Sequence, residues 1–368
     1  MKTFQFNLKN NFTNIFHLAD IHIPNDTDRH NEFIQVFDNL YKTIKSKCNN
    51  NSLIIICGDI IDKSGKISPN CINLCKSFLF NLSKLCYLII IPGNHDDNIR
   101  GNDTKIDSLS SIIEGMNYKN LFYFKETGIY KFNNIDFFHL SVFDLNQTII
   151  TKKDLDLNKI NICLYHGMIS SENQNFNNDF LKYQFKYNDF NHFNYVFLGD
   201  IHKHFYLNNN KTIAYPGSLL QLNYGEDILS HGGLLHWDLI NKNSNFINIS
   251  NQYGFITMDF KNNNFINNNN FIPKNIKIKI NIYNSYIPYN KLLELLQNEF
   301  INNNIIDIKP NYINTQNNTT INNFINNDDL EYFLKNKKKL DDKSINNILT
   351  IHKEELKMKI KHFLQFND

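Results

Sequence analysis

The feature that most constrains this chain is a series of short apolar runs, most of which end abruptly in polar residues. In chain order the runs are NIFHL, SLIIIC, CYLIII, IDFFHL, NICLYH and NYVFLG. Continuous β-rich runs of this length are typical of strands that are covered on both faces. Residues 31–47 and 70–85 carry apolar side chains at helical spacing. The sequence therefore predicts an α/β fold, with loops at the strand ends available for a functional site.

Five polar motifs follow these strands. They are Asp20-Ile21-His22, Gly58-Asp59-Ile60-Ile61-Asp62, Gly93-Asn94-His95-Asp96, His166-Gly167 and Gly199-Asp200-Ile201-His202. In an extended or tight-turn segment residues i and i+2 point the same way, so an Asp and a His at that spacing can bind one metal ion. Each motif alone is equally typical of a turn. Together they supply the carboxylate, amide and imidazole ligands that a pair of octahedral divalent ions requires.

The order of these motifs resembles that of the calcineurin-like metallophosphoesterases. Within that superfamily the chain resembles the SbcD-type nuclease subunits of double-strand-break repair, including their phage and viral relatives. The segments LGDIHKHF, IAYPGSLLQLNYGE and HGGLLHWDL carry this closer likeness. Protein phosphatases instead carry GD-x-V-D-R-G and GNHE, where this chain has GDIIDKSG and GNHDD. The resemblance implies a β-sandwich flanked by helices, in a four-layer arrangement.

The resemblance also implies a ligand set for two divalent ions, with Mn²⁺ expected and Mg²⁺ as the alternative. One ion would be held by Asp20, His22 and His202, the other by Asn94, His166 and Asp200, with Asp59 between them. Cellular relatives read G-H-x-H at the last motif, and this chain has Asp200 in place of the first His. Because Asp is a competent oxygen ligand, we expect the site to be retained with an altered metal preference. His204 is a possible substitute ligand.

Three further residues beside the ligands have roles implied by the resemblance. His95 would orient the scissile phosphate and protonate the leaving oxygen. Asp62 and Asp96 would orient the ligand histidines, with a simple turn role as the alternative for Asp62. His17 and His139 lie in apolar runs, where a core position is expected.

Nucleic-acid contacts are harder to identify, because the net charge of +2 neither requires nor excludes DNA. Basic residues in loops after two of the motifs could contact phosphates: Lys63, Lys66, Arg100 and Lys105. Ordinary solvated loop charge is the competing interpretation.

The composition changes after about residue 240, where Asn-dominated tracts such as NNNFINNNNF begin. They are interpreted as surface loops of a biased genome, with a disordered tract as the alternative. The runs FITMDF and IKIKINIY alternate as strands, and 291–300 is predicted to be helical. We expect a nuclease domain at 1–242, a smaller α+β capping and DNA-binding domain at 245–325, and C-terminal helices at 328–366 that dock a partner.

The cysteines and the N-terminus indicate a protein of a reducing compartment. The six cysteines lie mostly in apolar runs and are interpreted as small buried hydrophobes. Cys71 and Cys75, one helical turn apart, lack the further ligands that would complete a zinc site. Neither a signal peptide nor a membrane-length apolar run of ~20 residues is recognisable. A soluble intracellular protein is expected, and the Asn-rich composition suggests an AT-rich genome such as a viral one.

The leading hypothesis is a Mn²⁺-dependent DNA nuclease with 3′→5′ exonuclease and single-strand endonuclease activity. By resemblance it would work as a homodimer with an SbcC-type SMC-like ATPase. One alternative is a stand-alone phosphodiesterase that acts on a nucleotide or another small phosphoester. The other is a non-catalytic DNA-binding scaffold.

Overall fold

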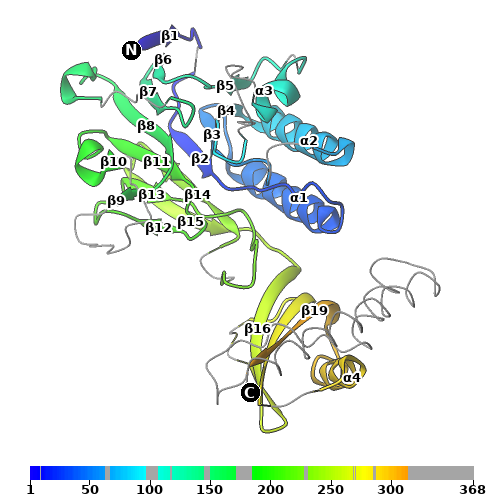
Figure 1. The fold of residues 1–368 in the computed structure, drawn as a ribbon. Helices are drawn as coiled ribbons and strands as arrows, with labels where there is room; N and C mark the ends of the chain where they lie inside the picture. Colours follow the sequence, from blue (N-terminus) through cyan, green and yellow to red (C-terminus); the bar gives the residue numbers. More distant parts are fainter. Residues whose placement is uncertain are drawn as a thin grey trace, which may run out of the picture. The chain divides into compact units, whose positions relative to one another are not determined.

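The computed structural model describes most of the chain up to residue 313. The described residues are 1–8, 10–62, 67–96, 107–116, 118–144, 150–170, 185–227, 231–267, 269, 271–284 and 287–313. The chain divides into two compact units, Met1–Gln252 and Tyr253–Asp368 (Figure 1). The candidate phosphate contacts Lys63, Lys66, Arg100 and Lys105 and the predicted C-terminal helices at 328–366 lie outside the described residues.

A six-stranded sheet forms one half of the first unit. Its order is β15 (Asn243–Asn248), β14 (Gly233–Asp238), β2 (Asn14–Leu18), β3 (Ser52–Cys57), β4 (Tyr87–Ile91) and β5 (Leu121–Tyr123). Strands β2 to β5 are parallel, and β14 joins β2 antiparallel. Because β15 pairs with β14, this unit continues past residue 242 to Gln252.

A seven-stranded sheet forms the other half. Its order is β1 (Lys2–Gln5), β6 (Gly128–Lys131), β7 (Ile135–Leu140), β8 (Ile160–His166), β11 (Tyr195–Gly199), β13 (Ile213–Tyr215) and β12 (Phe205–Tyr206). Strands β7, β8, β11 and β13 are parallel. A small sheet of β9 (Ile169–Ser170) and β10 (Phe185–Lys186) accompanies it.

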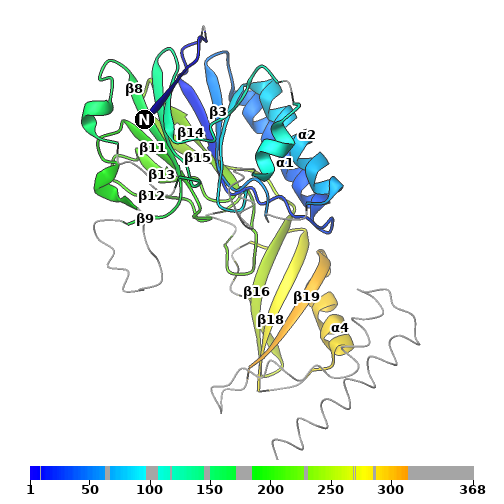
Figure 2. The same ribbon diagram turned by 45° about the horizontal axis from the view of Figure 1, so that its top comes forward.

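The layers follow from the alternation of side chains along the strands. Helices α1 (His30–Lys47) and α2 (Pro69–Leu85) lie side by side over one face of the six-stranded sheet (Figure 1, Figure 2). Ile54 and Ile56 of β3 pack in the core under these helices, whereas Leu53 and Ile55 pack between the two sheets.

Burial on both faces explains the continuous apolar runs, and the predicted α/β sandwich is confirmed. Helix α3 (Ser108–Ile113) precedes β5. Over the far face of the seven-stranded sheet, the described residues include the 3-10 turns η1 (Lys152–Asp154) and η2 (Tyr187–Asp189).

The second unit is a four-stranded sheet with a helix. The order is β17 (Asn264–Asn267), β16 (Tyr253–Lys261), β18 (Asn275–Tyr283) and β19 (Asn304–Ile313), with α4 (Tyr289–Glu299) between β18 and β19 in the chain. Leu292 and Leu296 of α4 pack with the isoleucines of β18 in one apolar core. The alternating pattern of the sequence therefore corresponds to a sheet with one face covered by apolar packing.

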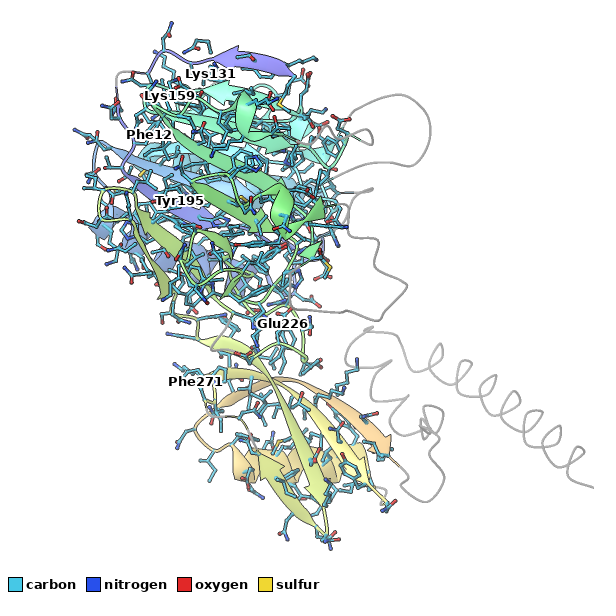
Figure 3. The ribbon with its side chains drawn as sticks, turned by 90° about the vertical axis from the view of Figure 1, so that its left-hand side faces the viewer. Phe12, Lys131, Lys159, Tyr195, Glu226 and Phe271 are labelled. Atoms are coloured by element: carbon cyan, nitrogen blue, oxygen red, sulfur yellow. The ribbon has the colours of Figure 1, made fainter. Side chains whose placement is uncertain are left out.

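The two ends of the sandwich in the first unit differ in their charged groups. At the end remote from Glu226, the buried carboxylate of Asp136 lies 2.8 Å from Lys159 Nζ and 4.0 Å from Lys131 Nζ (Figure 3). The carboxyl ends of the parallel strands lie at the other end, where acidic groups face histidines instead.

Candidate metal centre

The backbone of the candidate ligands is unusual. Asp20 and Asp59 have φ of 53°, His22 has 51° and Asp200 has 91°. Residues other than glycine rarely adopt this left-handed region, and where they do, the surrounding structure holds them at a cost of about 1–3 kcal/mol each. Of the extended and tight-turn geometries expected for Asp20-Ile21-His22, these positive φ values rule out the extended one. The turn is fixed by hydrogen bonds across to the next strand end, including that from His22 N to Asp59 O at 3.0 Å.

One side of the centre is formed by Asp20, His22 and His202, whose ligand atoms lie within 4.8 Å of one another. His22 Nε2 lies 3.1 Å from His202 Nε2 and 3.9 Å from Asp20 Oδ1. His202 Nδ1 donates to Glu226 Oε1 at 2.9 Å, which leaves the lone pair of its Nε2 facing His22.

The other side is formed around His166, which is 2% exposed. Its Nδ1 donates to the main-chain oxygen of Cys57 at 2.7 Å, so the lone pair of Nε2 faces inward. That Nε2 lies 3.0 Å from Asn94 Oδ1, 3.4 Å from Asp59 Oδ2 and 3.9 Å from Asp200 Oδ1. Acceptors that converge this closely need a positive charge among them.

Asp59 lies between the two sides. Its Oδ2 is 3.5 Å from His22 Nε2 and 3.4 Å from His166 Nε2, and its Oδ1 accepts from the main-chain N–H of His95 at 2.8 Å. Burial acts to raise the pKa of Asp59, but the charges of His166 and His22 and the bonds to His166 and His95 outweigh it and lower the pKa to about 2. Asp59 therefore stays ionised and available to both sides.

The pKa values of the other groups reflect their burial and their neighbours' charges. Burial raises the pKa of Asp20 to about 7 and lowers that of His22 to about 3, because it penalises the charged form of each. At His166 burial is outweighed by the charge and hydrogen bond of Asp59, which raise the pKa to about 10. The carboxylates thus draw positive charge into the centre. A divalent cation would supply such charge, and mixed oxygen and imidazole donors fit such an ion.

His95 and Asp62 lie against the first side. His95 Nδ1 donates to the main-chain oxygen of Asp62, and its ring is perpendicular to that of His22, with 4.8 Å between centroids. The carboxylate of Asp62 lies 3.7 Å from His22 Nδ1. Its Oδ1 is thus beside the nitrogen of His22 that does not face Asp59.

Asp96 acts on the main chain. Its carboxylate accepts from the N–H groups of Gly93, Ile61 and Ile60 at 2.9, 3.2 and 3.1 Å. These bonds fix the two loops that carry Asp59 and Asn94. Among the residues that the structure describes, the hydrogen bonds of the Asp96 side chain go to these loops and none goes to a ligand histidine.

Two glycines of the motifs are required by close packing against the ligands. A Cβ on Gly58, which has φ of 84°, would lie 2.2 Å from His166 Nδ1. A Cβ on Gly199 would lie 1.9 Å from the main-chain oxygen of Cys57, the acceptor of the His166 bond. Both positions therefore leave no room for a side chain while His166 keeps its anchor.

The YPGS segment holds the last two motifs in place. Tyr215 Oη donates to Gly167 O at 3.0 Å and accepts from Ile169 N at 3.1 Å. The main-chain N–H of Ser218 donates to His202 O at 2.8 Å. The sequence identified this segment only by its likeness to relatives; its contacts show that it shapes the loops after β8 and β11.

The other histidines in the part of the chain that the structure describes lie outside the ligand cluster. His204 Nδ1 bonds Tyr215 O at 2.9 Å and its ring stacks on Phe246 at 4.5 Å, so it is no substitute for Asp200. His17 and His139 are fully buried, as predicted for core residues, and each has one nitrogen bonded to a main-chain oxygen.

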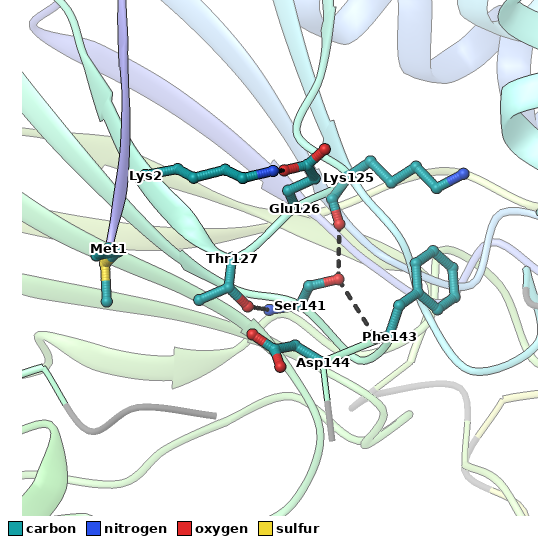
Figure 4. Close-up of a pocket in the computed structure, with 8 residues that line it drawn as sticks. All are labelled: Met1, Lys2, Lys125, Glu126, Thr127, Ser141, Phe143 and Asp144. Atoms are coloured by element: carbon teal, nitrogen blue, oxygen red, sulfur yellow. Dashed lines mark hydrogen bonds and ion pairs between the residues drawn. The ribbon is translucent and has the colours of Figure 1, made fainter. Parts of the chain in front are cut away.

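A separate cavity of about 500 Å³ is lined by residues of β1, the β5–β6 connection and the segment after β7. Figure 4 shows its polar groups pairing with one another: Ser141 Oγ donates to Lys125 O, Ser141 N donates to Thr127 Oγ1, and Lys2 pairs with Glu126. No candidate ligand lines it, so it is distinct from the metal centre.

Comparison with known proteins shows the family of the chain. Residues 13–212 match the calcineurin-like phosphoesterase family. The chain is also 36% identical over 314 residues to an uncharacterized protein of Acanthamoeba polyphaga mimivirus. That match covers 82% of this chain but only 23% of the viral protein's length. Among the described residues, no helix is both long and apolar enough to cross a membrane. The chain belongs to the calcineurin-like phosphoesterases, a family of metal-dependent enzymes.

Proposed function

We propose that this chain is a Mn²⁺-dependent DNA nuclease of the SbcD type, with 3′→5′ exonuclease and single-strand endonuclease activity. The observation that carries the chemistry is the position of Asp59 Oδ2, 3.5 and 3.4 Å from the Nε2 atoms of His22 and His166. One carboxylate oxygen placed between two groups of donors suits a bridge between two cations. Support for DNA as substrate comes from the YPGS segment and from the second unit.

Two divalent ions in this centre would lower the pKa of a water molecule and stabilise the charge of the phosphate in an in-line displacement. Asp20, His22 and His202 would bind one, and Asn94, His166 and Asp200 the other. Asp59 would contribute to both. The bond from His166 Nδ1 to Cys57 O and that from His202 Nδ1 to Glu226 hold each ring with Nε2 toward the centre.

His95 is proposed as the proton donor to the leaving oxygen. Its main-chain N–H is bonded to Asp59 and its Nδ1 to the oxygen of Asp62, so the ring has a fixed direction beside His22. With Nδ1 occupied, the nitrogen that faces substrate is Nε2, and an imidazole is suited to proton transfer near neutral pH.

We also propose which molecules the chain binds. Lys63, Lys66, Arg100 and Lys105 would contact the DNA backbone. The C-terminal segment at 328–366 would dock an SbcC-type SMC-like ATPase, and the nuclease subunits would form a homodimer. The second unit, which begins at Tyr253 rather than at residue 245, would restrict which DNA enters the site.

The test is cleavage of end-labelled duplex and single-stranded DNA by the purified chain with Mn²⁺. We expect shortening from the 3′ end by the wild type, and loss of cleavage in Asp59→Ala and His95→Ala proteins. His192→Ala, at a histidine outside the ligand cluster, is the folded control. Hydrolysis of bis-p-nitrophenyl phosphate without DNA cleavage would favour a stand-alone phosphodiesterase, and absence of Mn²⁺ binding would favour a non-catalytic scaffold.

A further inference from the structure

The loop 221–226 places a carboxylate behind one of the candidate ligands. Glu226 Oε1 accepts from His202 Nδ1 at 2.9 Å, and its Oε2 accepts from the main-chain N–H of Leu222 at 2.6 Å. Asn223 Nδ2 donates to Oε1 at 2.8 Å. The side chain of Glu226 is 9% exposed, compared with 31% for His202. Glu226 is therefore more buried than the ligand it touches, and two further hydrogen bonds hold its carboxylate.

This loop is fixed from the other side by Arg29, which precedes α1. Its Nη2 donates to Gln221 O at 2.7 Å and its Nη1 to Leu222 O at 3.4 Å. Its Nε donates to Glu32 Oε2 at 2.8 Å, and Glu32 is 2% exposed. Because a guanidinium presents its donors in a planar fork, one side chain can bind both carbonyls and the carboxylate in a single geometry.

The same carboxylate of Glu32 also accepts a hydrogen bond from the last residues of the first unit. Asn251 Nδ2 donates to Glu32 Oε1 at 3.2 Å, and Asn251 lies two residues before Tyr253, where β16 begins. The neighbouring residue Ser250 is also bound to α1, because Asn39 Nδ2 donates to its oxygen at 2.8 Å. Asn39 thus holds the main chain of this linker, whereas Asn251 joins it to the carboxylate of Glu32.

We propose that Glu226, held by Arg29 and Glu32, is a positioning residue for His202, and that the linker at Asn251 is tied to the metal centre through these bonds. The inference rests on the metal centre of the proposed function but does not depend on DNA as the substrate. Glu226 fixes the ring of His202 and increases the basicity of its Nε2. Arg29 acts only through the loop that carries Glu226.

The direct test is calorimetric titration of the metal-free full chain with Mn²⁺. Carboxylates that hold a ligand histidine typically change metal affinity by about 10–100-fold. Glu226→Ala should therefore lower the affinity for one of the two Mn²⁺ ions by that factor and leave the affinity for the other unchanged. Arg29→Ala should lower the affinity for the same ion by about tenfold. The double variant should be no weaker than Glu226→Ala, because residues acting in series are not additive.

A spectroscopic readout separates positioning from simple loss of stability. With Co²⁺ in place of Mn²⁺, Glu226→Ala and Arg29→Ala should change the visible absorption of the same ion. Glu226→Gln keeps an acceptor and should restore most of the wild-type spectrum. If Arg29→Ala does not fold, Arg29→Lys, which keeps charge without the fork, should give the same change more weakly.

The linker is tested by the pair Asn251→Ala and Asn39→Ala. Only Asn251→Ala should lower the affinity of the ion at His202, by a few-fold. If both variants lower this affinity equally, or if neither does, the linker is not tied to the metal centre. Additive losses for Arg29 and Glu226, or unchanged metal affinity in both, would overturn the positioning role. These results do not require DNA cleavage, so a wild type that binds Mn²⁺ but spares DNA would contradict only the nuclease proposal.

Discussion

The two sides of the metal centre hold equivalent histidines by different means. His166 is anchored by the main chain, since its Nδ1 donates to Cys57 O within the packed interface of the two sheets. His202 is anchored by a side chain, Glu226, on a loop. The side chain of His166 is 1% exposed and that of His202 is 31% exposed.

We call the side of the centre at His166 the fixed side and the side at His202 the adjustable side. A main-chain acceptor cannot be changed by mutation of its own residue, so the His166 side depends on the fold itself. The His202 side depends on a carboxylate that substitution or movement of a loop can alter. We therefore expect the ion at His166 to bind more tightly than the ion at His202.

The largest effect is expected from Asp59, which serves both sides. Asp59→Asn should lower the hydrolysis of bis-p-nitrophenyl phosphate by about 10³-fold or more, which corresponds to about 4 kcal/mol of transition-state stabilisation. Steady-state rates at saturating Mn²⁺ measure it. A loss of less than tenfold would show that the sides do not share Asp59.

The fixed side should be sensitive to a single methyl group. Gly58→Ala places a Cβ 2.2 Å from His166 Nδ1, whereas Gly115 has the same φ of 84° and nothing within 4 Å. Gly115→Ala should cost only the backbone strain, about 1–2 kcal/mol. Gly58→Ala should cost about 1–3 kcal/mol more and impair metal binding. Urea unfolding of the two variants gives the comparison, and equal costs would contradict it.

Binding of Mn²⁺ should stabilise the fold in two steps, one for each side of the metal centre. A ligand at 100 times its dissociation constant stabilises a fold by about 2.7 kcal/mol. Thermal unfolding at increasing Mn²⁺ should therefore show two concentration ranges of stabilisation, and Glu226→Ala should shift only the weaker one. A shift of the tighter range would reverse the assignment of the sides.

The interface between the two sheets, which contains His17, should lose stability as the pH falls. His17 Nε2 donates to Leu198 O across the two sheets, and burial lowers the pKa of His17 to about 3. Its folded pKa lies below the unfolded value of 6.5, so its stability contribution is present above pH 6.5 and is lost as the pH falls toward 3. The loss is about 2 kcal/mol between pH 6.5 and 5. His17→Phe should reduce this dependence in urea unfolding, and an unchanged slope would contradict it.

The smallest effect is expected at the edge of the adjustable side. Asp62 Oδ1 lies 3.7 Å from His22 Nδ1, and its side chain is 42% exposed. Asp62→Asn should weaken Mn²⁺ binding by less than about tenfold, because a partly solvated partner contributes little. Calorimetry measures it, and a loss as large as that of Glu226→Ala would mean that solvent does not screen this pair.

Much of the fold could be predicted from local pattern. Runs such as SLIIIC predicted strands buried on both faces, and the structure and the family match confirm an α/β phosphoesterase sandwich. The motifs at the strand ends also marked which residues the structure brings together, because parallel strands deliver their carboxyl ends to one edge.

What the sequence could not show depends on distant pairs and backbone strain. Glu226 lies 24 positions from His202, and Arg29 lies 192 positions from Gln221. No spacing rule links such residues, although Glu226 is the last residue of the segment IAYPGSLLQLNYGE that carried the likeness. The left-handed φ of Asp20 and His22 is held by contacts with neighbouring loops, so local propensity could not decide between an extended and a tight-turn segment.

The central claim is a two-sided centre joined by Asp59, and electron paramagnetic resonance of the Mn²⁺-loaded chain tests it most directly. The wild type should bind two Mn²⁺ ions whose spins are magnetically coupled, and Asp59→Asn should abolish the coupling. A wild type that binds one ion, or two ions without coupling, would contradict the account.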